Sequence, residues 1–276
     1  MRRWGILIAL VVFCLAALPH AANAQRQLAP PSFTTLLEAH AKNNLPRGSI
    51  PRVAKGQAIA APMVYVTVTR TKVMLYGQTL VQVKGGLLTS KQLRRCDRSI
   101  CLPRVRDRIA SARARLAYKL GAVPRVLVFV DGNASYDTLL TVLRSICESG
   151  AALSLRLAAR DRRGTLVALP VLAWPNRRVV VDHAGRPGLI RVEVSGIGGI
   201  VTATKTYSAR PQRAHNARDL LDVLGRLKLA SGRDAVFLSG GPHSSAAHML
   251  AIIAHARTLF SSVILTSAGD GVYAVP

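Results

Sequence analysis

Three histidines in the last quarter of the chain are the residues whose type most suggests metal chemistry. His243, His248 and His255 lie on or beside one predicted helix, and His248 and His255, seven positions apart, share a face. Histidines on one helix usually bind a metal ion at a spacing of i and i+4, or together with a nearby carboxylate, and this segment has neither. The pattern favours partly exposed histidines that flank an apolar stripe, so no metal site is predicted.

A glycine pair before that helix suggests phosphate chemistry. Gly240 and Gly241 follow a predicted strand, and the amides of a helix N-terminus attract anions. The segment lacks the Gly-Lys-Ser/Thr ending of a phosphate loop, and Pro242 removes one amide, so a tight strand-to-helix turn is the better interpretation. The chain also has no G-x-S-x-G elbow, no paired-carboxylate motif and only 13 acidic residues. We therefore expect no catalytic or cofactor-binding residues, and a periplasmic enzyme is the least favoured of the functions considered.

The cysteines suggest one structural bond. Cys96 and Cys101 lie five positions apart, and an oxidising compartment would favour a local disulfide between them. A zinc site would need more ligands, and no histidine lies near this pair in the sequence. Cys147 continues a helical apolar pattern with Leu139, Leu143 and Ile146, so we expect it to be a buried apolar side chain rather than a nucleophile.

The formal charge of +25 is unevenly distributed. Residues 25–188 hold 27 Lys and Arg against 8 Asp and Glu, whereas residues 189–276 hold 9 against 5. Arginine dominates, and its planar guanidinium suits phosphate and carboxylate. Only 5% of the residues are aromatic, which disfavours stacking on nucleic-acid bases. The expected partners are an acidic protein, anionic lipid headgroups or a cell-wall polymer, and the alternative is a cationic surface without a particular partner.

The N-terminus has the features of a secretory signal peptide. Arg2 and Arg3 precede an apolar run from Trp4 to Leu18, and Ala22-Asn23-Ala24 forms an A-x-A cleavage site. Fifteen apolar residues are fewer than the roughly 20 that cross a bilayer. We expect residues 1–24 to be removed and the chain to reach the periplasm, the alternative being an uncleaved anchor in the inner membrane with the rest of the chain facing the periplasm.

Residues 61–160 show the pattern of a small α/β module. An alternating segment from Met63, a turn at Arg70-Thr71-Lys72 and a continuation to Val83 predict a β-hairpin. An amphipathic helix is predicted from Pro103 to Leu120 with Gly121 as its stop. A buried strand ending at Asp131, a helix closing on Gly150 and a strand from Ala151 follow, and the two strands should be parallel because one helix joins them.

The same order of elements returns in residues 189–276. Two strands surround Gly198-Gly199, and a helix, a strand, the histidine-bearing helix and a last strand follow. We therefore predict an α/β fold, a two-layer α+β sandwich made of two tandem ββαβαβ modules with mixed sheets. The predicted division is a signal peptide (1–24), a linker with a short helix around Phe33 to Ala41 (25–60), a first module (61–160), a connector that adds strands or merely connects (161–188) and a second, diverged module (189–276).

The first module resembles the periplasmic domain of the ExbD/TolR family. The likeness rests on the hairpin MVYVTVTRTKVMLYGQTL with its following long helix, and on the strand LVFVD, whose Asp131 precedes Tyr136 by five positions before a helix that closes on Gly150. The second module is fainter, because Ser239 replaces the aspartate and the tyrosine is lost. The resemblance implies two tandem copies of this domain, the second diverged.

The resemblance also implies a function in transport across the envelope. Members of the family partner a membrane channel protein, dimerise, and conduct protons with an aspartate in their transmembrane helix, whereas Trp4 to Leu18 contains no acidic residue. We therefore expect a non-catalytic periplasmic interaction module, accessory to an energy-transduction or transport complex, that does not bind nucleic acid and pairs as a homodimer. The alternative is an exported arginine-rich binder of anionic lipid or cell-wall polymer. The candidate partner-binding residues are Asp131, Tyr136, Arg104, Arg108 and Arg115, and Asp131 alternatively caps the following helix.

Overall fold

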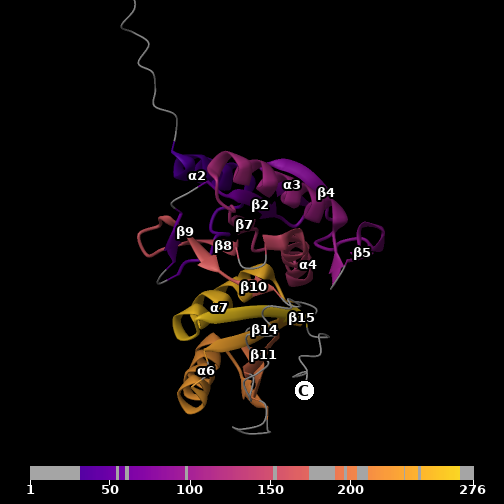
Figure 1. Ribbon diagram of the computed structural model, residues 1–276. Coiled ribbons are helices and arrows are strands. Elements are labelled where there is room, and N and C mark those ends of the chain that lie inside the picture. Colours follow the sequence, from indigo (N-terminus) through magenta and orange to yellow (C-terminus); the bar gives the residue numbers. More distant parts are fainter. Residues whose placement is uncertain are drawn as a thin grey trace, which may run out of the picture.

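The computed structural model describes residues 32–53, 56–59, 62–96, 99–151, 154–173, 190–195, 198–203, 211–232, 234–241 and 244–267 (Figure 1). The predicted signal peptide, His243 and the part of the predicted connector from residue 174 onward lie outside these ranges. In the ranges described, no helix combines the length and the apolar character needed to cross a bilayer. The described elements are helices packed on mixed β-sheets, so the predicted α/β fold is confirmed.

Within the described residues, seven strands form the first sheet, in the order β1-β9-β8-β7-β2-β3-β4. Strands β2, β7 and β8 are parallel, as predicted for the last two. Strands β3 and β9 pair antiparallel with β2 and β8, and β4 and β1 pair antiparallel with β3 and β9. All five positions of β7 are buried, which agrees with its continuous apolar run. The strands are β1 (Gln57–Ala58), β2 (Val64–Val68), β3 (Lys72–Leu75), β4 (Gln78–Gln82), β7 (Val126–Val130), β8 (Leu155–Arg160) and β9 (Leu166–Pro170).

The second sheet has six strands in the part of the chain described, in the order β10-β15-β14-β11-β12-β13. Strands β11, β14, β15 and β10 are parallel. Strand β12 pairs antiparallel with β11, and β13 pairs antiparallel with β12. A two-stranded ribbon of β5 (Arg94–Arg95) and β6 (Ile100–Cys101) lies apart. The second sheet comprises β10 (Leu172–Ala173), β11 (Ile190–Ser195), β12 (Gly198–Ala203), β13 (Gln212–Ala214), β14 (Ala235–Gly240) and β15 (Ser262–Ser267).

Five strands of each sheet share one topology. The order β4-β3-β2-β7-β8 in the first sheet corresponds to β13-β12-β11-β14-β15 in the second. The helices correspond as well: α3 (Pro103–Leu120) matches α6 (Ala217–Ser231), and α4 (Tyr136–Ile146) matches α7 (Ala246–Leu259). The internal repeat inferred from the order of elements is therefore present in the sheet topology.

The starts of α4 and α7 are joined to each other between the two sheets (Figure 1). The Tyr136 amide donates to the Ser244 carbonyl at 3.1 Å, and the Ala246 amide donates to the Ala134 carbonyl at 2.9 Å. These bonds exchange equivalent positions of the two repeats, as they would about a two-fold axis. Amides at a helix start lack partners within the helix. Here each repeat supplies a carbonyl acceptor to the other.

Each of these helices begins at a serine that caps it. Ser135 accepts from the Thr138 amide, and Ser245 accepts from the His248 amide. A β-bridge links the two serines directly. The predicted helix start around Asn133-Ala134-Ser135 is thus found where two N-caps meet.

Tyr136 secures the junction from the first repeat. Its side chain is only 1% exposed, and its hydroxyl donates to the Thr266 carbonyl at 2.9 Å and to the Leu238 carbonyl at 3.3 Å. The ring packs closely against Gly240, where a Cβ atom would approach the ring Cγ to 2.9 Å. Glycine is needed at this position because any side chain would displace the tyrosine.

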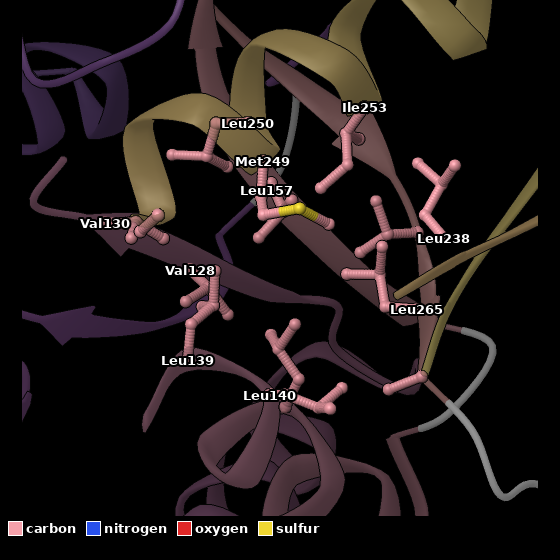
Figure 2. Packing of buried hydrophobic residues seen from close by; sticks show 14 of the residues in the cluster. Val128, Val130, Leu139, Leu140, Leu157, Leu238, Met249, Leu250, Ile253 and Leu265 are labelled. Atoms are coloured by element: carbon pink, nitrogen blue, oxygen red, sulfur yellow. The ribbon is translucent and has the colours of Figure 1, made fainter. Parts of the chain in front are cut away.

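One hydrophobic cluster extends through both modules (Figure 2). Eight of the eleven residues of α4 are buried, and so are seven of the fourteen of α7. Helices buried on this scale are covered on more than one side. Figure 2 shows side chains from both helices and both sheets gathered in this cluster, among them Val128, Val130, Leu139, Leu140, Leu238, Met249, Leu250, Ile253 and Leu265.

The predicted hairpin is a three-stranded meander, because the second strand does not continue to Val83. It turns at Tyr76 and Gly77, whose φ angles of 52° and 82° both lie in the left-handed region. Two consecutive residues of this kind form the tight turn that suits twisted strands. The turn was not predicted from the sequence because tyrosine is rarely the first residue of such a turn.

The predicted linker and the predicted connector both contain regular structure, and the short helix expected near Phe33 is present. In the predicted linker (25–60), α2 (Phe33–Asn44) packs Leu37 and Ala41 into a second cluster with Leu127 and Phe129. Alternate residues of a strand face opposite sides of the sheet, so α2 covers the face of β7 opposite to α4. The first sheet therefore has helices on both faces. In the predicted connector, β9 and β10 extend one sheet each, so this segment adds strands.

Two short helical elements complete the described chain. The 3-10 helix η1 (Ser90–Gln92) follows β4, and a π-helical turn η2 (Cys147–Ala151) ends α4. Gly150 adopts a φ of 83° in that turn, which explains why the predicted helix closes there.

The contact of Tyr136 with Gly240 predicts that Gly240→Ala destabilises the fold by about 1–3 kcal/mol, because the added methyl group overpacks the junction. Urea unfolding followed by fluorescence measures this. Gly225→Ala in α6 is the matched control, since nothing lies within 4 Å of its Cβ position. The control should stabilise the helix by about 0.5–1 kcal/mol. An equal response of the two variants would contradict the close approach.

The docking of α2 predicts a dependence of stability on pH. Buried His40 bonds through Nε2 to the Thr67 hydroxyl at 2.6 Å, and its Nδ1 lies 3.2 Å from the Asn44 amide nitrogen. Burial lowers the pKa of His40. The neutral ring therefore stabilises the fold above the unfolded pKa of about 6.5, and this contribution is lost as the pH falls below that value.

Urea midpoints between pH 8 and pH 5 test this dependence. His40→Gln should flatten the decline on the acid side, whereas His255→Gln, at an exposed position of α7, should follow the unsubstituted protein. Identical pH profiles for His40→Gln and the unsubstituted protein would show that His40 does not titrate on unfolding.

Candidate binding groove

Helix α3 forms as predicted because its apolar and basic residues lie on different faces. Val105 and Ile109 are buried against the first sheet, and Gly121 ends the helix with a φ of 64°. The start of the helix is fixed by the Leu102 amide, which donates to the Ser145 hydroxyl of α4 at 2.8 Å. The basic face is therefore held at a defined place beside α4.

Four basic residues of α3 line a groove along the edge of the first sheet. They are Arg104, Arg108, Arg115 and Lys119, all exposed, and their spacing places them on one side of the helix. Small Ser111 and Ala112 lie among the lining residues.

The opposite wall of the groove is β4 with the end of β3. The groove consists of two adjoining hollows of about 650 and 360 Å³, which share Thr79, Leu80 and Arg104. Figure 1 shows α3 and β4 next to each other at the top of the molecule. Lys91 and Arg94 extend the basic lining beyond the start of α3. Of the residues described, those that line the two hollows include no aspartate or glutamate.

Two other arginines of α3 bond to other groups of the chain. Arg113 donates to the Ser149 carbonyl at 3.0 Å and to the Pro124 carbonyl at 3.4 Å, and burial lowers its pKa. Arg106 forms an ion pair with Asp107 at 2.7 Å. By contrast, no described carboxylate forms an ion pair with Arg104, Arg108 or Arg115. The sequence alone does not distinguish these arginines from one another. The structure does, because Arg106 and Arg113 bond to other groups of the chain, whereas Arg104, Arg108 and Arg115 line the groove.

A disulfide joins Cys96 and Cys101, whose Cα atoms lie 5.8 Å apart. It closes the loop that carries β5 and β6 immediately before α3. The loop thereby holds Arg94, at one end of the groove, close to Arg104 at the start of the helix.

The predicted site residues Asp131 and Tyr136 do not lie among the groove's lining residues. Asp131 is 6% exposed and accepts a hydrogen bond from the Asn133 amide at 2.9 Å, so it orders the turn before α4. Tyr136 is buried in the junction between the modules. The structure therefore places Arg104, Arg108 and Arg115 together and assigns Asp131 and Tyr136 to the interior of the fold, where burial withholds the tyrosine from a separate partner.

Nothing in the sequence indicated that the site includes Tyr76, Lys91, Arg94 or the edge of β4. The Tyr76-Gly77 pair is the local signal for the tight turn, and a turn at this point implies that a short third strand follows it. The position of that strand at the sheet edge depends on pairing with β3, which no local pattern specifies.

The described histidines do not assemble a metal site. His255 bonds within its own helix, from Nδ1 to the Ala251 carbonyl at 2.8 Å. His248 lies half-buried near the start of α7, and burial lowers its pKa. In the part of the chain that the structure describes, no group of three or more His, Cys, Asp or Glu side chains could hold a metal ion.

No protein-family model matches the chain, and no curated protein does. Among solved structures, the type II variant of the Aquifex aeolicus Ppx/GppA phosphatase aligns with 65% of this chain and 67% of its own, at 13% identity and a TM-score of 0.15. A second Aquifex aeolicus structure of the Ppx/GppA family aligns with 65% of this chain and 66% of its own, at 11% identity and the same TM-score. Superpositions this poor carry no argument about fold or activity.

The environment of Cys147 predicts a thiol that resists alkylation in the folded protein. Burial raises its pKa to about 12, so almost no reactive thiolate exists at pH 8. Iodoacetamide followed by peptide mass mapping should leave Cys147 unlabelled until the chain is unfolded, whereas Cys96 and Cys101 should become reactive once a reductant is added. Cys147 packs against the core and is partly buried, not fully buried as expected. Its rapid labelling in the folded state would contradict the raised pKa of its thiol.

Proposed function

We propose that this chain is a non-catalytic interaction module of the periplasm that binds an anionic protein partner in the groove between α3 and β4. The observation that carries the proposal is the set of exposed basic side chains, Arg104, Arg108, Arg115 and Lys119, that share this groove. Like charges held along one recess repel each other, and a bound anion relieves that repulsion.

The resemblance to the ExbD/TolR family supports a place for the module in the envelope. The elements on which the resemblance rests follow one another in the described chain: strands β2 and β3, helix α3, strand β7 with Asp131, helix α4 and strand β8. Because Trp4 to Leu18 lacks an acidic residue, the proposed role is accessory to an energy-transduction or transport complex, without proton conduction.

The second candidate is an exported binder of anionic lipid or cell-wall polymer. Its support is the end of α3, where Tyr118 is 94% exposed beside Lys119, and Leu120 and Val123 are exposed as well. Basic residues beside exposed apolar and aromatic ones suit the interface of an anionic membrane.

A pull-down from envelope extract at low and high salt distinguishes the two functions. The unsubstituted protein should recover a defined envelope protein at both salt concentrations. Replacing Arg104, Arg108 and Arg115 together by glutamine should reduce this recovery about tenfold or more, because the contacts of the groove are charge-assisted.

The matched control replaces Arg162, Arg163 and Arg218 by glutamine, three exposed arginines outside the groove lining that lower the net charge equally. Equal recovery by the groove variant and the unsubstituted protein would contradict the proposal. Recovery of lipid or polymer only, lost at high salt, would favour the second candidate.

A further inference from the structure

Strand β4 is an edge of the first sheet, and it is the longest edge strand of the described sheets. It has five residues, whereas the other edge strands β1, β10 and β13 have two, two and three. Proteins usually protect such an edge with charged residues or proline on the strand itself. The sequence of β4, QTLVQ, contains neither a charged residue nor proline. Its pairing with β3 shifts register between Val73 and Met74, a bulge of the kind that also modifies an edge.

One end of β4 already bonds to a group outside the sheet. The side-chain amide of Gln92 in η1 donates to the Gln82 carbonyl at 2.8 Å. This carbonyl therefore receives a side-chain donor where a neighbouring strand would supply a backbone amide. The remaining residues from Gln78 to Val81 line the groove opposite α3.

We infer that the groove binds an extended acidic segment of a partner protein, which adds to the first sheet as a strand beside β4 while its carboxylates bond to the arginines of α3. The inference rests on the proposed function and names the partner's chemistry. An edge strand offers backbone amides and carbonyls, which an extended peptide can match residue by residue. A lipid headgroup or a sugar polymer could pair with the arginines but not with this edge.

The spacing of the basic residues suits such a segment. Arg104 and Arg108, like Arg115 and Lys119, lie one helical turn apart, or about 6 Å along the axis. Side chains on one face of a strand repeat about every 6.6 Å. An extended segment with glutamate at every second position can therefore place neighbouring carboxylates near the two basic side chains of each pair. The two pairs are separated by the seven residues from Arg108 to Arg115, about 10.5 Å along the helix. Guanidinium groups bind carboxylates bidentately, which favours arginine in this place.

Binding of synthetic peptides to the full chain tests the inference. The probe is a fluorescent octapeptide that alternates glutamate with valine, measured by anisotropy at low salt. Replacing its glutamates by glutamine should weaken binding about tenfold or more. Two further versions carry N-methyl groups on alternate backbone amides, in one register or the other, at unchanged charge. One of the two should lose about tenfold or more in affinity, since only alternate amides of a paired strand face its neighbour.

Hydrogen exchange supplies an independent readout on the protein. The acidic peptide should slow amide exchange in the segment 76–83, which contains β4, and leave the segment of β13 unchanged. The glutamine variant of Arg104, Arg108 and Arg115 should lose the binding, and the control at Arg162, Arg163 and Arg218 should keep it. Circular dichroism of both variants establishes that α3 is intact.

Several results would overturn the added strand. Equal binding of all N-methylated versions would show that charge alone holds the peptide, and the proposed anionic partner would stand without strand pairing. Vesicles of phosphatidylglycerol that bind through the three groove arginines while the peptide does not would assign the groove to lipid. Failure of the peptide to bind, together with an unchanged pull-down by the groove variant, would overturn the proposed function as well.

Discussion

The fold depends on the contact between the starts of α4 and α7, where each repeat completes the hydrogen bonds of the other. Helix starts leave amides without partners, and burial makes such amides costly. Here the Tyr136 and Ala246 amides are satisfied by carbonyls of the opposite repeat, and the Tyr136 hydroxyl reaches two carbonyls of the second sheet. Neither helix start is complete within its own repeat. The hydrophobic cluster that surrounds this junction is continuous through both modules.

The sequence predicted the elements whose signals are local. Helix α3 was expected from Pro103 to Leu120 because the apolar stripe, the proline near its start and Gly121 all lie within its own residues, and the structure has these bounds. The parallel pairing of β7 with β8 followed from the single helix between them. The tight turn at Tyr76-Gly77 was missed because its residue types are unusual for two left-handed positions, and β4 was consequently merged with β3.

The same difference between local and long-range signals applies to the residues of the candidate site. Local spacing places Arg104, Arg108 and Arg115 on the exposed side of α3, but it cannot distinguish them from Arg113, whose partners Pro124 and Ser149 follow from tertiary packing. Tyr136 is the opposite case. Its position after Asp131 suggested a surface that meets a partner, while its hydroxyl acceptors lie more than a hundred residues later in the chain. Hydrogen bonds over such a sequence separation cannot be predicted from the residues around the tyrosine.

The repeats are alike in topology and different in charge, and this difference bears on how many ligand sites the proposed function gives each molecule. Helix α6 stands where α3 stands in the first repeat, but it carries Asp219 and Asp222 among its basic residues, and Asn216 and Lys228 bond to nearby aspartates. Two identical subunits related by a two-fold axis would present the same recess twice. In this chain the two copies have diverged, and within the described residues the groove lined by Arg104, Arg108, Arg115 and Lys119 belongs to the first repeat. In the proposed function, a ligand with repeated acidic segments would therefore collect several of these chains along its length.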